Sequence, residues 1–163
     1  MKRIQFLTKM IKEGKLQLVN PSENISYSYL SKSDSNLESA KILLKSDKLE
    51  ESISLSYYSM YHCLLALLFK HGIKSENHTA SIILLRELFK EKDLADIIGL
   101  AKKERIDKQY YIDFEVTRDD CEDMIKKTEK FTIKCKILIK KLDNDKIEMV
   151  LLFKEDTTCH KLR

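Results

Sequence analysis

One stretch of this chain is apolar or aromatic around its whole circumference if it is helical. It is the run SYYSMYHCLLALLF at positions 56–69, within a helix expected at residues 49–71. A helix without a polar face has to be surrounded by other helices, because otherwise it would expose apolar side chains to water. The stretch therefore predicts the buried central helix of a bundle, in a chain of which 34% of the residues are charged.

The rest of the composition is also that of a helical protein. The 163 residues include only 3 Gly, 1 Pro and no Trp, whereas a β-rich chain needs many more turn residues. The length suits a single domain with a sizeable core. We expect an all-α fold, an antiparallel up-and-down bundle of four to five main helices.

Hydrophobic periodicity and capping residues place these helices along the chain. A short helix at residues 4–11 and an extended or irregular segment at 15–20 precede the turn at Asn20-Pro21. We then expect helices at 22–45, at 49–71, from 75–77 to Phe89, at 94–103 and from Thr117 to about residue 142. A capping box at Asp47 should begin the second of these helices and Gly72 should end it, and Thr117 should cap the last. Residues 105–116 have no clean period and predict a loop. The expected units are residues 1–20, the bundle at 21–143 and a C-terminal arm at 144–163.

Charge and cysteine usage narrow the functional classes. A net charge of +4 permits an anionic partner but is low for a non-specific nucleic-acid binder. The four cysteines form no C-x-x-C pair and the histidines show no tight ligand spacing, so we expect reduced thiols, no metal and no cofactor. The apolar run at 57–69 is too short to span a bilayer and contains His62. We therefore expect a cytoplasmic protein with no membrane contact.

The central stretch resembles the HEPN (higher eukaryotes and prokaryotes nucleotide-binding) domain family. The similarity lies in the run SYYSMYH at 56–62, then Ala66-Leu67-Leu68, Gly72, Lys74 and His78, followed by Arg105, Tyr110 and a long helix with an acidic start. A small prokaryotic branch of that family has the pattern A-Y-Y-A-M-F-H-x-x-x-A-L-L in this place. The resemblance covers roughly residues 21–142.

The resemblance implies a fold, partners and a chemistry. HEPN domains are antiparallel helical bundles that usually dimerise, and many are encoded beside a minimal nucleotidyltransferase that acts as an antitoxin. Many members are ribonucleases that cleave RNA without metal, with Arg and His of an R-x4-6-H motif meeting across two subunits. By this resemblance we expect a homodimer, a nucleotidyltransferase partner, and a nucleotide or RNA as ligand.

The chain departs from the R-x4-6-H motif at its histidine. Four residues separate Arg105 from Tyr110, so Tyr110 occupies the position at which R-x4-H has its histidine. The next histidine along the chain is His160. Tyrosine has a pKa of about 10 and is a poor general base at neutral pH, although it can donate a hydrogen bond to phosphate or stack on a base. This departure weighs against ribonuclease activity.

Each candidate site residue also has a purely structural interpretation. Arg105 can grip a phosphate, or it can cap a helix or pair with a nearby aspartate. Tyr110 can line a cleft or pack a loop, and His62 is either a site residue or a hydrogen-bonded core histidine. His78 opens a helix, where it can reach a phosphate or fix the preceding loop. The candidate nucleotide- or RNA-binding residues are Arg105, Tyr110, Tyr111, His78, Tyr58 and His62, with Arg105 and Tyr110 as catalytic candidates.

Three functions fit this pattern. The first is a HEPN-type nucleotide- or RNA-binding module in a toxin–antitoxin-like or nucleotidyltransferase-associated system, with little catalysis. The second is a metal-independent endoribonuclease toxin, in which Arg105 and Tyr110 act with His62 or His78. The third is a structural helical adapter in which the polar residues have no ligand.

Overall fold

Helix α3 (Leu49–Lys70) lies at the centre of the fold, as its apolar sequence predicts. The computed structural model describes residues 2–110 and 115–141, which contain six helices and two short strands. The other elements are α1 (Lys2–Lys12), β1 (Leu16–Leu18), α2 (Glu23–Lys45), β2 (Ile73–Ser75), α4 (His78–Glu87), α5 (Lys92–Tyr110) and α6 (Arg118–Lys141). The predicted all-α bundle is confirmed, and the predicted arm at 144–163 lies outside the described residues.

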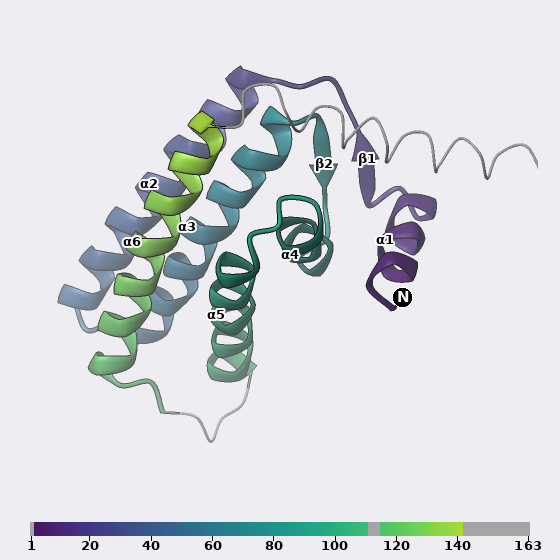
Figure 1. Cartoon of the computed structure of the whole chain (residues 1–163). Coiled ribbons are helices and arrows are strands. Elements are labelled where there is room, and N and C mark those ends of the chain that lie inside the picture. The colour runs from purple at the N-terminus through teal and green to yellow at the C-terminus, as the bar shows by residue number, and fades with distance from the viewer. Residues whose placement is uncertain (1, 111–114, 142–163) are drawn as a thin grey trace, which may run out of the picture.

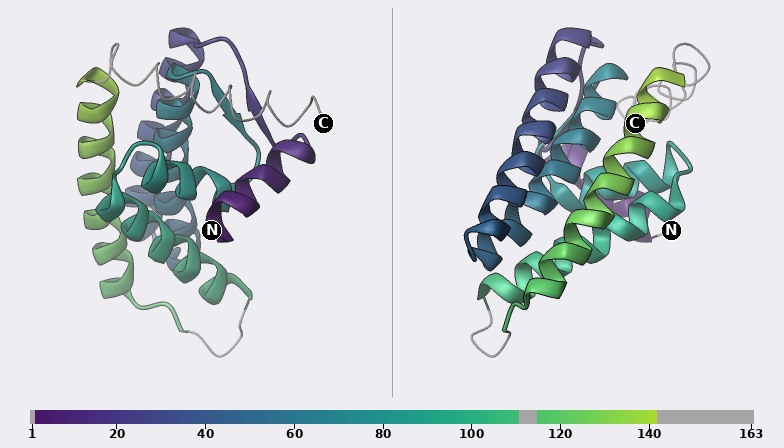
Figure 2. Two further views of the ribbon diagram at one scale, coloured as in Figure 1. Left: turned by 45° about the vertical axis from the view of Figure 1, so that its right-hand side comes forward. Right: turned by 90° about the vertical axis from the view of Figure 1, so that its left-hand side faces the viewer.

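Three long helices run side by side, and the shorter helices pack against one side of them. Helices α2, α3 and α6 form this layer, while α4 and α5 lie against α3 and α1 lies beyond α4 (Figures 1 and 2). Helix α3 is long and apolar enough to cross a membrane by length and composition, but 78% of its most apolar window is buried in the bundle. Burial among helices therefore accounts for its apolar sequence.

Small polar residues allow α2 and α3 to approach closely. Ser33 Oγ donates to the carbonyl oxygen of Ser59, Ser59 Oγ donates to that of Ser33, and both bonds measure 2.8 Å. Ser26 Oγ donates to the carbonyl oxygen of Ala66, also at 2.8 Å. These buried hydroxyls are satisfied by backbone carbonyls of the neighbouring helix, so they do not carry the cost of a buried unpaired polar group.

A short antiparallel pair of strands ties the first segment to the turn after α3. Leu16 pairs with Ser75 and Leu18 with Ile73. The predicted extended segment at 15–20 thus contains β1, whereas β2 lies in a connection for which we predicted no strand. Gly72 ends α3 with φ +72°, and a Cβ there would lie 2.6 Å from the carbonyl oxygen of Val19. Glycine is needed here both for its backbone conformation and for the close approach of the first segment.

The predicted caps are correct for α2 and α6 and wrong for α3. Ser22 accepts from the backbone N–H of Ile25, and Thr117 and Asp120 form a reciprocal capping box. Helix α3 has no side-chain cap. Asp47 instead adopts φ 58° and accepts from Arg118 Nη2 at 3.1 Å, which joins the α2–α3 turn to α6.

The loop predicted from residue 105 is also wrong in its first half, because α5 continues to Tyr110. Its last turns gain tertiary contacts that the local sequence does not indicate. Glu104 forms an ion pair with Lys127 of α6 at 3.5 Å, and Arg105 packs on two tyrosines of α3. Arg105 therefore occupies a helical position one turn after Lys102.

Candidate functional site

A polar cleft of about 270 Å³ lies between the first turn of α4 and the C-terminal half of α5. Lys102 Nζ donates to Thr79 Oγ1 at 2.7 Å, which joins the two helices at the cleft. The first turn of α4 contains no acidic residue, and the Asn77 side chain caps it by accepting from the backbone N–H of Ala80. The cleft is lined by Glu76, Asn77, His78, Thr79, Lys102 and Arg105.

His78, the first residue of α4, contacts two tyrosines of α3 at the floor of the cleft. The His78 ring is parallel to that of Tyr61, with centroids 3.8 Å apart. The Tyr57 hydroxyl and His78 Nδ1 share a hydrogen bond of 2.5 Å. Tyr57 is fully buried, because the apolar helix α3 surrounds it with core side chains. The imidazole is thus held in one orientation by a ring on its face and a hydroxyl on its edge.

The guanidinium of Arg105 lies over the same aromatic group. Its central carbon is 5.2 Å from the ring centroid of Tyr57 and 5.4 Å from that of Tyr58. Such cation–π contacts favour a guanidinium position over the rings and restrict its movement, while its N–H donors remain able to bind other groups. This arrangement orients a group that can bind a phosphate in a bidentate manner.

The electrostatics of the site keep its histidine neutral. Burial, followed by the charges of Lys102 and Arg105, lowers the pKa of His78 from 6.5 to about 4. Burial also raises the pKa of Tyr57 and, together with Arg105, lowers that of Lys102. The positive charge of the cleft at neutral pH therefore comes from Lys102 and Arg105, and not from His78.

His62, the other predicted histidine, lies beside this cleft and is not part of its lining. Its Nδ1 is 2.9 Å from Asn36 Nδ2 of α2, and its ring is 6.2 Å from that of Tyr58. Burial, followed by the charge of Lys32, lowers the pKa of His62. His62 is therefore a hydrogen-bonded, half-buried residue at the seam between α2 and α3.

The structure brings together half of the predicted site. Arg105, His78 and Tyr58 meet at one place, and His62 is their neighbour. The side chains of Tyr110 and Tyr111 lie outside the described part of the structure. Within the described residues, no group of three His, Cys, Asp or Glu side chains is placed to hold a metal ion.

Sequence reasoning missed four residues of the cleft lining and the two tyrosines that hold His78. They are Glu76, Asn77, Thr79, Lys102, Tyr57 and Tyr61. Lys102 looks like any lysine on a solvated helical face. Because the predicted helix ended at residue 103, the sequence did not place Lys102 and Arg105 one turn apart on the same helix. Thr79 directly follows the predicted site residue His78, and this position in the sequence was the one indication that Thr79 belongs to the site. Tyr57 sits in an apolar helix, where an aromatic residue is ordinarily a packing residue.

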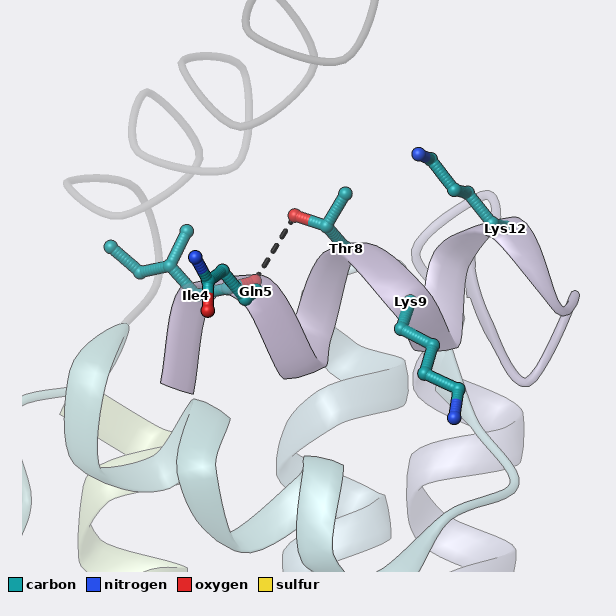
Figure 3. Close-up of a pocket in the computed structure, with 5 residues that line it drawn as sticks. All are labelled: Ile4, Gln5, Thr8, Lys9 and Lys12. Carbon is teal, nitrogen blue, oxygen red and sulfur yellow. Dashed lines mark hydrogen bonds between the residues drawn. The ribbon is translucent and has the colours of Figure 1, made fainter. Parts of the chain in front are cut away.

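A second hollow, of about 410 Å³, lies on the outer face of α1, but it lacks convergent polar groups. It is lined by Ile4, Gln5, Thr8, Lys9 and Lys12. Thr8 Oγ1 donates to the carbonyl oxygen of Ile4 within the same helix, and the two lysines point in different directions (Figure 3). The cleft between α4 and α5 is therefore the better candidate, because its polar side chains come from two helices and meet.

Comparison with known proteins supports the resemblance seen in the sequence. Residues 26–138 match the HEPN domain model, a range that includes α3, α4, α5 and most of α6. A UPF0332 protein of Pyrococcus horikoshii is 45% identical over 49 residues, which are 30% of this chain and 34% of that protein. The matched segment thus spans about a third of that relative's length.

Proposed function

Because this chain belongs to the HEPN domain family, we propose that the cleft between α4 and α5 binds a phosphate group of a nucleotide or an RNA strand. The observation that carries the proposal is the convergence of Lys102 and Arg105 on the first turn of α4. Two cations and a helix N-terminus make a site for an anion. Tyr57 and Tyr58 below Arg105 restrict the position of one of these cations through cation–π contacts.

Binding without cleavage fits the state of the histidine in this site. A general acid or base works best when its pKa lies near the operating pH. The pKa of His78 is lowered to about 4, so at neutral pH it is not the imidazolium that a general acid requires, and it is a weak base. A neutral imidazole can still contribute a hydrogen bond to a ligand oxygen. We therefore place Arg105 and His78 in binding roles, and RNA cleavage by this cleft is the alternative that the experiment tests.

The proposal is tested by titration calorimetry with adenosine monophosphate and with a short single-stranded RNA. Arg105→Ala should weaken both affinities by about 10- to 100-fold, as expected for the loss of charge-assisted hydrogen bonds. Lys103→Ala is the matched control, because it removes one positive charge from the exposed side of α5 outside the cleft lining. Equal losses in both variants would indicate a general charge effect. No binding by the unmodified protein would refute the proposal and favour a structural adapter.

The same preparation decides between binding and cleavage. The RNA is incubated with the protein in EDTA, and the product ends are analysed. We expect the RNA to remain intact. Fragments with 2′,3′-cyclic phosphate ends that are absent with Arg105→Ala would show that the protein is a metal-independent endoribonuclease despite the neutral His78.

The proposal includes two partners that the family resemblance implies, a second copy of the chain and a nucleotidyltransferase. Sedimentation velocity at micromolar concentration tests the homodimer, and co-purification with a nucleotidyltransferase encoded nearby tests the second partner. A monomer that still binds the nucleotide would show that the cleft of one chain is sufficient. In that case a toxin–antitoxin-like role would rest on the second partner alone.

A further inference from the structure

A row of half-buried rings leads from the cleft across α3 to α2. Tyr58 lies under Arg105 at 5.4 Å, and its ring is 6.2 Å from that of His62. The His62 ring is in turn 5.8 Å from that of Tyr29 on α2. All three rings are partly exposed, in contrast to the fully buried Tyr57. The aromatic group of the cleft therefore continues along the surface instead of ending in the core.

The middle of this row carries a defined pair of polar groups. The side-chain amide nitrogen of Asn36 is 2.9 Å from His62 Nδ1. Because an amide NH2 only donates, Nδ1 is the acceptor and the proton of the neutral imidazole is on Nε2. The pair thus offers a donor, the Nε2–H of His62, and an acceptor, the carbonyl oxygen of Asn36. Both residues are half-buried, so their orientation is fixed while part of each remains accessible.

A third cation stands at the far end of the row. Lys32 Nζ lies 5.8 Å from the ring centroid of Tyr29, and Lys32 is exposed. Lys32 precedes Asn36 by four residues on α2, so the two residues lie on the same face of that helix. The surface therefore has positive charge at both ends, with rings and a donor–acceptor pair between them.

We infer that Tyr29, Lys32, Asn36 and His62 form a second subsite, which takes the nucleobase of a nucleotide adjoining the one held in the cleft. This inference rests on the proposed function. Partly exposed rings provide stacking surfaces for a base, and the polar groups of Asn36 and His62 can hydrogen-bond to it. Lys32 attracts the phosphate beyond that base, as Lys102 and Arg105 do in the cleft. The ligand class is then a single strand of at least two nucleotides.

Rings along a helix seam can also serve packing alone, and the distinction lies in their surroundings. Rings that only fill a seam are covered by apolar neighbours, as Tyr57 is in the core. Here the Tyr29 ring is stacked on Phe69 with centroids 5.4 Å apart. Tyr29, Tyr58 and His62 are nevertheless partly exposed, and they adjoin an exposed lysine and a polar pair. A seam that needed only to exclude water would not need these groups at its surface.

The test compares three ligands by fluorescence anisotropy and competition: adenosine monophosphate, a short oligoadenylate, and an abasic oligomer of the same length. If the subsite exists, the oligoadenylate should bind at least about tenfold more tightly than either of the others, because base stacking adds to phosphate binding. The double variant Lys32→Gln/Asn36→Ala should lose at least about fivefold in affinity for the oligoadenylate and change the affinity for the mononucleotide less than about twofold. Lys45→Gln is the matched control, since it removes an exposed lysine from the other end of α2.

The outcomes separate this inference from the proposed function. Equal affinity for oligoadenylate and mononucleotide, or for oligoadenylate and abasic oligomer, would overturn the base subsite and leave phosphate binding in the cleft intact. An unchanged oligoadenylate affinity in the double variant would also overturn it. If no ligand binds to the unmodified protein, the proposed function fails and the subsite fails with it.

Discussion

The neutral state of His78 makes a measurable prediction about stability and pH. In the folded protein the pKa of His78 is lowered from 6.5 to about 4 by burial and by the charges of Lys102 and Arg105. Between these two pH values the unfolded chain binds a proton at His78 and the folded chain does not. Protons therefore favour the unfolded state in this window, and the free energy of unfolding rises with pH from about 4 to about 6.5.

The magnitude follows from the size of this change in pKa. A pKa lowered from 6.5 to about 4 corresponds to at most about 3.4 kcal/mol. His78 is only half-buried, so solvent screens the neighbouring charges and reduces this figure. We expect about 1–2 kcal/mol of unfolding free energy to be lost as the pH falls from about 6.5 to about 4.

Urea denaturation followed by far-ultraviolet circular dichroism measures this loss at a series of pH values. The comparison is with His78→Asn, which keeps an amide group within reach of the Tyr57 hydroxyl but does not titrate. The difference in unfolding free energy between the two proteins isolates His78, because His62 and the carboxylates titrate in both. This difference should be constant above about pH 6.5. Toward about pH 4 the unmodified protein should lose about 1–2 kcal/mol of unfolding free energy relative to the variant.

A difference that stays constant across the window would refute the reasoning. It would mean that His78 has the same pKa in the folded and unfolded chains, and that water reaches it well enough to offset its burial and the two cations. A shift of the opposite sign would mean that the folded state favours the charged imidazole, and His78 would then become a candidate proton donor.

The remaining predictions concern the backbone and the caps that hold the site elements. Gly72→Ala should destabilise the protein by about 2–4 kcal/mol in thermal or urea unfolding, because φ is +72° and the new Cβ would lie 2.6 Å from the carbonyl oxygen of Val19. Gly99→Ala is its control and should stabilise the protein by about 0.5–1 kcal/mol, since it is helical and a Cβ there meets nothing within 4 Å. Thr117→Ala should cost about 1 kcal/mol in urea unfolding, because it removes the side chain that accepts from Asp120 N–H at the start of α6.

The arrangement of the helices could be predicted because it follows from strong local patterns. Residues 49–70 have no polar face, so burial was the only outcome consistent with a helix there. Ser22 and Thr117 are caps with a clear local signature, and the structure has both. Strand β2 could not be predicted, because its three residues form a strand only by pairing with a segment more than fifty residues earlier in the chain.

The site could be predicted only in part, because its geometry depends on contacts between helices. His78 and Tyr58 were predicted from a family pattern, but nothing local to either places them against Arg105. Arg105 was assigned to a loop because residues 105–110 lack helical periodicity. Its contacts with the α3 tyrosines, and the Glu104–Lys127 ion pair, hold that segment as a helix. Tertiary contacts of this kind override weak local preference.

The charges of the cleft place opposite demands on binding and on proton transfer. In the proposed function Lys102 and Arg105 attract a phosphate, and the same charges lower the pKa of His78 and so keep it neutral. A catalytic histidine would need a negative group nearby to return its pKa to neutral pH. The acidic residue in the cleft lining, Glu76, has its charge engaged by Lys74 at 2.8 Å. The two cations proposed to bind an anion are thus also the ones that make His78 a poor proton carrier, which is why we propose that the cleft binds its ligand without cleaving it.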